Sequence, residues 1–203
     1  DNPNTAITKI ANQIEKLKKD GNTIQQIGNS MIFLSDNGVY GMNFIDLYNL
    51  RGQDLPLSSP IEGIMQRITK EYVHNATSVY FDNRYYLAIP IDESSTNNAL
   101  VIYNFINKQW ESVDSIANTS WDFTHLVVGG ADSQRGVYCI NRNGGVHRYE
   151  ARSDDTDNYV IQVGEEAVST QVDSSVVTRM FVLNSIDRKK WNNFELHIES
   201  RST

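Results

Sequence analysis

The chain has 203 residues, 39% hydrophobic and 10% aromatic, which is enough for a sizeable core and argues against wholesale disorder. Its formal net charge is −7 and no extended basic cluster occurs, which argues against a protein that grips nucleic acid by its phosphates. Cys139 is the only cysteine, so an internal disulfide and a cysteine-based zinc cluster are both excluded.

A helix is predicted near the start of the chain, from Thr5 to Asp20. Thr5 can cap its start and Gly21 can end it. Its apolar residues recur at three- and four-residue spacing and form one stripe: Ile7, Ile10, Ala11, Ile14 and Leu17. The stripe can dock on the protein's own sheet or on a neighbouring subunit, and the sequence favours neither. We therefore divide the chain into an N-terminal helix with its linker (1–26) and a region of strands (27–203).

The strand region begins with a predicted hairpin, Ser30–Ser35 and Val39–Phe44. The intervening Asp36-Asn37-Gly38 is typical of a type I′ or bulged turn. Leu50–Ser59 is interpreted as a loop. A short helix follows it through Ile68, with Ser58 or Ser59 as its cap and Pro60 at its first position.

The central stretch, residues 77–114, predicts four strands in succession: Ser78–Asp82, Arg84–Ile91, Ala99–Phe105 and Gln109–Asp114. Tyr85–Ile89 and Leu100–Tyr103 are apolar without alternation, which indicates burial on both faces of the sheet. Short hairpin connections make the pairing antiparallel, so crossover helices cannot cover those faces. The simplest cover is another four-stranded sheet on each side, as in the blades of a β-propeller. The packing residues that we single out are Tyr85, Leu87, Ile89, Leu100, Ile102 and Trp110.

A third unit is predicted from three further strands, beginning near His125, Gly136 and Gly145. After it, Ser153–Asn158 is interpreted as an exposed acidic loop, since the glycine and terminal glutamate of an EF-hand calcium loop are missing. Two more strands are predicted at Val176–Leu183 and Phe194–Glu199. These strands are too few for the four or more blades of a closed propeller. The sequence also starts at Asp1 rather than Met, so we expect a partial propeller that belongs to a longer subunit.

No catalytic, cofactor-binding or metal-binding residue can be assigned. The sequence has no GxSxG elbow, HExxH, P-loop or dinucleotide-binding glycine pattern, and its four histidines have no ligand spacing. Five carboxylates cluster around the central stretch: Asp82, Asp92, Glu93, Glu111 and Asp114. Paired carboxylates cleave glycosidic bonds in some propellers, so the alternative function is a carbohydrate-binding or glycan-cleaving propeller at a host surface. No apolar run is long enough to span a membrane.

Six short stretches carry a resemblance to a known family, in the order in which that family has them. They are Asn37–Tyr40 (NGVY), Asn49–Ser58 (NLRGQDLPLS), Ile61–Ile68, Asn83–Ala88 (NRYYLA), Val101–Asn104 (VIYN) and Gln109–Ser112 (QWES). Together they resemble the tail nozzle proteins of short-tailed bacteriophages, also called tail tubular protein B. The resemblance covers residues 27–114 well and the remainder only in character. Its motifs mark blade structure rather than a catalytic site.

The resemblance implies a structural virion protein located in the tail. Subunits of that family contain a β-propeller and assemble as a homohexameric ring, whose channel carries the genome during ejection into the host. The implied partners are the adaptor ring (tail tubular protein A), the tail fibres and double-stranded DNA in transient passage without specific binding. The acidic charge is compatible with such a conduit, because each phosphate neutralised by Lys or Arg adds affinity that moving DNA must break.

Overall fold

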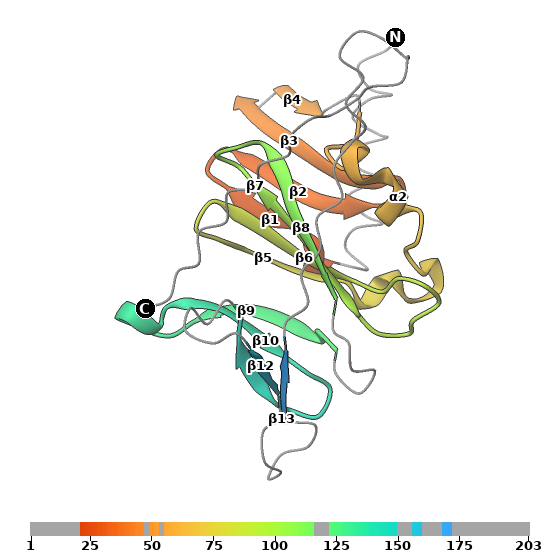
Figure 1. Ribbon diagram of the computed structural model, residues 1–203. Coiled ribbons are helices and arrows are strands. Elements are labelled where there is room, and N and C mark those ends of the chain that lie inside the picture. Colours follow the sequence, from red (N-terminus) through yellow and green to blue (C-terminus); the bar gives the residue numbers. More distant parts are fainter. Residues whose placement is uncertain are drawn as a thin grey trace, which may run out of the picture.

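The computed structural model describes residues 21–46, 49–52, 55–115, 122–149, 156–159 and 168–171. In these residues the protein is mainly β, with antiparallel sheets and a few short helical segments (Figure 1). The predicted helix Thr5–Asp20 and the predicted strands Val176–Leu183 and Phe194–Glu199 lie outside the described residues. Within the described residues, no helix has the length and apolar character needed to cross a membrane.

The first sheet is a four-stranded meander, preceded by the 3-10 turn η1 (Gly21–Thr23). Its strands pair in chain order: β1 (Gln25–Ile27), β2 (Ser30–Ser35), β3 (Gly38–Asp46) and β4 (Asn49–Gly52). The hairpin β2–β3 was predicted and is confirmed. The predicted loop Leu50–Ser59 was wrong for Leu50–Gly52, because the backbone of Asn49–Gly52 pairs with β3. Strand β1 was not predicted. Strands β1 and β4 are short and mostly polar. They form because they pair with a neighbouring strand, and their own sequences have no pattern typical of a strand.

The turn between β2 and β3 depends on Gly38. It has a positive φ of +127°, whereas Asp36 and Asn37 do not have positive φ. A type I′ turn needs positive φ at both central residues, so that form is excluded and the glycine-dependent alternative remains.

A helical connection leads from the first sheet to the second. It consists of η2 (Ser59–Ile61), α2 (Glu62–Met65) and η3 (Lys70–Asn75). Pro60 lies in the first turn as predicted, but the α-helix ends at Met65 and neither start is capped by a side chain. Apolar residues of this connection, among them Ile61, Ile64 and Val73, pack against the core between the first two sheets.

The second sheet contains the four predicted strands, and these predictions are confirmed to within two residues. It runs β5 (Thr77–Phe81), β6 (Arg84–Ile89), β7 (Ala99–Asn104) and β8 (Gln109–Ser115), again paired in chain order. The turn between β5 and β6 is built by Asp82 and Asn83, with φ values of +46° and +59°. Two successive left-handed residues are the type I′ geometry that suits the twist of a hairpin.

The third sheet has three strands within the described residues, β9 (His125–Gly129), β10 (Gly136–Ile140) and β11 (Val146–Arg148), as predicted. The turn η4 (Asp132–Gln134) joins the first two of these strands. A separate antiparallel pair follows, β12 (Thr156–Tyr159) and β13 (Val168–Gln171). The interpretation of Ser153–Asn158 as a loop was therefore wrong for its last residues, since Thr156, Asp157 and Asn158 belong to β12.

The second sheet is buried on both faces, and every residue of β7 is buried. One face, with Tyr85, Leu87 and Val101, packs against Ile32, Leu34 and Val39 of the first sheet. The other face, with Tyr86, Leu100 and Ile102, packs against Leu126, Val137 and Cys139 of the third sheet. The prediction that sheets cover both faces is confirmed.

The three sheets approach each other most closely at their first strands. Strand β1 lies beside β5, and β5 lies beside β9. Figure 1 shows the sheets following one another in the order of the chain, red to orange, then yellow to green, then teal. The later strands of neighbouring sheets diverge, and between the first and second sheets the helical connection fills the space.

Candidate functional site

The packing residues that the sequence singled out lie in the second sheet, as expected. Tyr85, Leu87 and Ile89 point towards the first sheet, whereas Leu100 and Ile102 point towards the third. These five side chains are at most 3% exposed. Trp110 is only partly buried and packs at the margin of the first cluster. The hydrogen bonds that hold the three sheets together lie in two places, which we call the first and the second junction.

The first junction joins the β2–β3 turn, the following connection and strand β8. Leu57 donates its backbone N–H to the carbonyl oxygen of Val39 at 2.7 Å. The backbone N–H of Val39 donates to Oγ of Ser58 at 3.0 Å, and Ser58 is fully buried. Trp110 Nε1 donates to the carbonyl oxygen of Leu57 at 3.0 Å. Residues from three distant parts of the chain are thereby tied together by hydrogen bonds.

Gly38 makes this junction possible. A Cβ atom at position 38 would lie 2.4 Å from Oγ of Ser58, and its φ of +127° is itself unfavourable for other residues. Ser58 or Ser59 was predicted as a helix cap, and Ser58 does lie at the N-cap position of η2. Its hydroxyl makes no capping hydrogen bond, because it accepts the hydrogen bond from Val39 instead.

Tyr85 links the second sheet to η1, the turn that precedes the first sheet. Its ring is fully buried and its hydroxyl donates to the carbonyl oxygen of Thr23 at 2.8 Å. Beside it, Gln25 Nε2 donates to the carbonyl oxygen of Ser78 at 3.0 Å, joining β1 to β5. Burial raises the pKa of Tyr85 far above its ordinary value, so the phenol remains a neutral donor.

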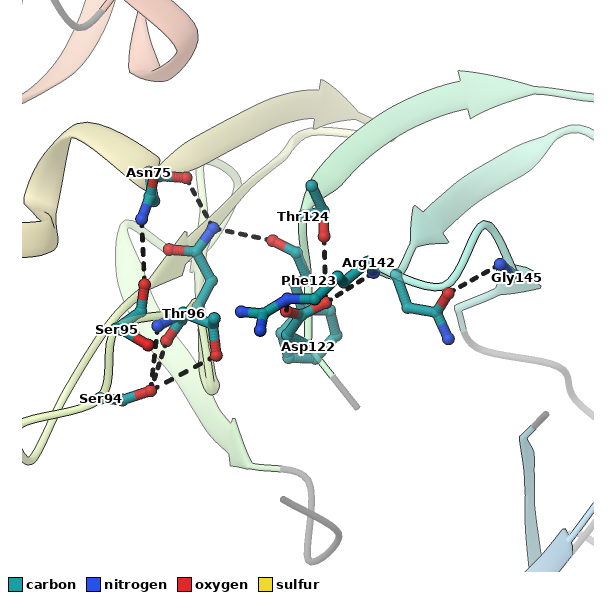
Figure 2. Close-up of polar contacts among 11 residues, drawn as sticks. Asn75, Ser94, Ser95, Thr96, Asp122, Phe123, Thr124, Arg142 and Gly145 are labelled. Atoms are coloured by element: carbon teal, nitrogen blue, oxygen red, sulfur yellow. Dashed lines mark hydrogen bonds and ion pairs between the residues drawn. The ribbon is translucent and has the colours of Figure 1, made fainter. Parts of the chain in front are cut away.

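The second junction joins the second sheet to the third and is centred on Asn97, which is 2% exposed. Its Nδ2 donates to the carbonyl oxygens of Asn75 and Phe123, each at 2.7 Å (Figure 2). The backbone N–H of Phe123 donates back to the carbonyl oxygen of Asn97 at 2.9 Å. Asn97 therefore connects the end of η3, the loop before β7 and the segment that leads into β9.

Asp122 extends the second junction to the loop after β10. Its Oδ1 accepts hydrogen bonds from Thr124 Oγ1 at 3.0 Å and from the backbone N–H of Arg142 at 2.8 Å (Figure 2). Its Oδ2 lies 3.2 Å from Arg142 Nε. Asp122 is only 6% exposed, and these contacts satisfy the buried carboxylate.

Asn141 closes the loop between β10 and β11. Its Oδ1 accepts the backbone N–H of Gly145 at 2.7 Å, and its own N–H donates to the carbonyl oxygen of Gly145 at 3.0 Å. Beyond this loop, Tyr149 packs edge-on against Tyr86 of the second sheet, with ring centroids 5.8 Å apart. The Tyr149 hydroxyl donates to the Asp114 carboxylate of β8. The third sheet is thus attached to the second at both ends.

Asp92 and Glu111, two of the five carboxylates considered for a glycosidase, are held by structural partners. Arg67 forms a two-pronged ion pair with Asp92, and hydrogen bonding from Arg67 lowers the pKa of Asp92. Burial opposes ionisation of Glu111, but hydrogen bonds from Arg84 and Asn104, each 2.6 Å, outweigh it and lower the pKa of Glu111. Neither acid has the raised pKa that a general acid requires.

Neither a cluster of metal ligands nor a reactive thiol occurs among the described residues. Among the described residues, no cluster of three or more His, Cys, Asp or Glu side chains can hold a metal ion. Cys139 is 1% exposed, and burial raises its pKa to about 12, so it is not a reactive thiolate. A shallow surface hollow lies beside the Arg67–Asp92 pair and is lined also by Ile68, Thr69 and Glu93.

The junction residues Asn97, Asp122 and Asn141 were missed by the sequence reasoning. Asn97 lay in a stretch interpreted only as the link between two strands, and Asn141 only as part of a turn. The available signal was the placement of Asn and Asp beside strand ends, where their side chains bond nearby backbone groups.

Comparison of the chain with protein-family models, with curated proteins and with solved structures finds no match.

Proposed function

We propose that this protein is a structural, non-enzymatic subunit of a short phage tail, a nozzle subunit that forms part of the channel for genome ejection. The observation that carries the proposal is the stacking of successive antiparallel meanders, with the second sheet buried on both faces. The proposed architecture is part of a β-propeller, with residues 27–203 contributing blades to a larger subunit.

The arrangement of first strands supports this architecture. In a propeller, blades are repeated radially about a central channel, so that neighbouring sheets converge towards the channel and diverge away from it. Here β5 contacts both β1 and β9, and the helical connection packs against the core between the first two sheets. The hydrogen bond from Gln25 to Ser78 lies at this convergent end.

The motifs that carry the family resemblance also support a scaffold role. Gly38 and Val39 belong to the first motif, Leu57 and Ser58 to the second, and Trp110 to the last. All five meet in the first junction, where the side chain of Ser58 and the indole of Trp110 bond to the backbone. These residue types are therefore required by packing, and no catalytic role is needed to explain them.

The proposed partners follow from the nozzle role. Six copies would form a ring below the tail adaptor protein and close to the tail fibres, with double-stranded DNA passing through without specific binding. The net charge of −7 is compatible with this passage, since each phosphate neutralised by Lys or Arg would add affinity that moving DNA must break. The corresponding location is the tail of the virion.

Negative-stain electron microscopy of the larger subunit, to which these blades are proposed to belong, tests the proposal. A six-fold ring with an axial hole is the expected image, and a lone compact disc contradicts the nozzle role. A glycan array on the same preparation tests the carbohydrate-directed alternative. Specific glycan binding or turnover by a monomeric disc would replace the nozzle proposal with that function.

A further inference from the structure

The chain contains two Asn-Gly pairs, and the structure describes both of them. Asn37-Gly38 lies in the β2–β3 turn, and Asn143-Gly144 lies in the loop between β10 and β11. The side-chain amide of Asn can react with the backbone nitrogen of the next residue. Glycine permits this reaction best, because it has no Cβ to obstruct the approach and its backbone is the most adaptable. Both pairs carry the same reacting groups, so in the folded protein their surroundings decide which pair reacts.

The fold holds the first pair in place. Asn37 is exposed, but Gly38 is buried and belongs to the β2–β3 ladder. The next residue, Val39, is bonded through its N–H to Oγ of Ser58 at 3.0 Å and through its carbonyl oxygen to the N–H of Leu57 at 2.7 Å. The Gly38 backbone also packs so closely on Ser58 that a Cβ there would lie 2.4 Å from the hydroxyl. Movement of the Gly38 nitrogen towards the Asn37 side chain therefore requires the first junction to open.

The second pair lies on the surface and outside any strand. Asn143 and Gly144 are both exposed. The N–H of Gly144 donates to the carbonyl oxygen of Asn141 at 3.1 Å, within a turn where water can compete for both groups. The reacting backbone at this pair is thus released by opening one exposed turn, which costs less than opening a buried ladder.

We propose that Asn143 is a site of spontaneous deamidation in the folded protein, whereas the fold protects Asn37. The backbone nitrogen of Gly144 gives its proton to water and forms a bond to Cγ of Asn143. The bond from Cγ to Nδ2 breaks, and Nδ2 takes a proton from water and leaves as ammonia. Water then hydrolyses the resulting succinimide at either of its two carbonyl groups, which gives aspartate or isoaspartate.

The products alter a loop that contributes to the second junction. Each product places a negative charge directly after Arg142, whose backbone N–H and Nε both contact the carboxylate of Asp122. Isoaspartate also adds a methylene group to the backbone of the loop that Asn141 closes through Gly145. We therefore expect deamidation to weaken the attachment of the third sheet to the second. The reaction belongs to the chain itself, whether or not the protein is a tail nozzle.

Peptide mapping by mass spectrometry tests the proposal on the full chain. The protein is incubated in mildly alkaline buffer, folded or in urea, and is then digested with trypsin under mildly acidic conditions that slow the reaction. Cleavage after Arg142 and Arg148 leaves Asn143 as the only Asn of its peptide, and fragmentation locates Asn37 within its longer peptide. In the folded chain Asn143 should convert at least about fivefold faster than Asn37, because reaction at Asn37 requires a buried ladder to open. In urea the two rates should become equal.

A smaller ratio in the folded chain, a faster reaction at Asn37, or a ratio that persists in urea would overturn the proposal. The control Asn143→Gln has a side chain one methylene longer, which cannot close the five-membered ring. It should abolish the mass increase of this peptide and leave conversion of Asn37 unchanged.

Hydrogen exchange on the deamidated fraction measures the effect on the second junction. Amides of β10 and β11 should lose protection while those of β6 and β7 keep it. Unchanged exchange in β10 and β11 would show that the modification leaves the junction intact and would overturn that part of the proposal.

Discussion

Two leucines on opposite faces of the second sheet provide the sharpest test of its double burial. Leu87 points into the cluster shared with the first sheet, Leu100 into the cluster shared with the third, and both are 0% exposed. Truncating a buried leucine to alanine costs about 2–5 kcal/mol, the lost transfer free energy plus the cavity that remains. Since a domain of this kind is stable by about 5–15 kcal/mol, Leu87→Ala and Leu100→Ala should each fold but be markedly destabilised.

Urea unfolding followed by circular dichroism measures this cost. With a slope of about 2–3 kcal/mol per molar urea, each variant should lower the midpoint by about 1–2 M at an unchanged slope. Leu55→Ala is the control, because that side chain is 73% exposed and its truncation should change stability by less than about 0.5 kcal/mol.

A sheet with only one buried face would give a different result. If either Leu87→Ala or Leu100→Ala behaved like Leu55→Ala, the face that carries that leucine would not be covered and the reasoning would fail. Leu100→Asp is the stronger form of the test, because an unpaired carboxylate would be buried between two sheets and should prevent folding. A soluble Leu100→Asp variant that unfolds cooperatively would refute the double burial.

Three further predictions concern the junctions and their titratable groups. Asn97→Ala removes the donor to two carbonyl oxygens and should cost about 1–3 kcal/mol in thermal unfolding, whereas Asn107→Ala, at an exposed turn, should not. Arg67 holds the pKa of Asp92 in the folded state below its value in the unfolded state. The contribution of this pair to folding stability is therefore present above the unfolded-state pKa, and it is lost as pH falls through the folded-state pKa. Arg67→Gln should raise the pKa of Asp92 in an NMR titration, and an unchanged pKa would contradict the pairing. Cys139, whose pKa burial raises to about 12, should react with a thiol reagent only after unfolding, and rapid labelling of the folded protein would show that the second and third sheets are not packed together.

The strands of the second sheet were predictable because their pattern is set by burial itself. Leu100–Tyr103 has no polar residue to alternate with the apolar ones, and only a strand covered on both faces permits that. The polar turn at Asp82-Asn83 was predictable for a local reason, since Asp and Asn tolerate the left-handed backbone that a tight hairpin needs.

The elements that were missed depend on contacts between distant residues. Asn49–Gly52 carries no strand pattern, and its pairing with β3 alone makes it β4. Ser58 is a reasonable helix cap by local rules, yet the backbone of Val39, 19 residues earlier, binds its hydroxyl. Local propensity does not predict which of two hydrogen-bond partners a residue takes when one of them is distant in the sequence.

Apolar burial and hydrogen bonds make different contributions at the two junctions. Burial of Leu87 or Leu100 attracts the neighbouring sheet but is not directional, so it would tolerate several rotations of one sheet on the next. The bonds from Tyr85 to Thr23 and from Asn97 to Phe123 are directional, and each joins a buried donor in the second sheet or its loops to backbone that leads into a neighbouring sheet. A rotated sheet would leave these donors unpaired inside the protein, at a cost of about 1–3 kcal/mol each. The buried polar residues therefore select one arrangement of the three sheets among those that the apolar clusters permit.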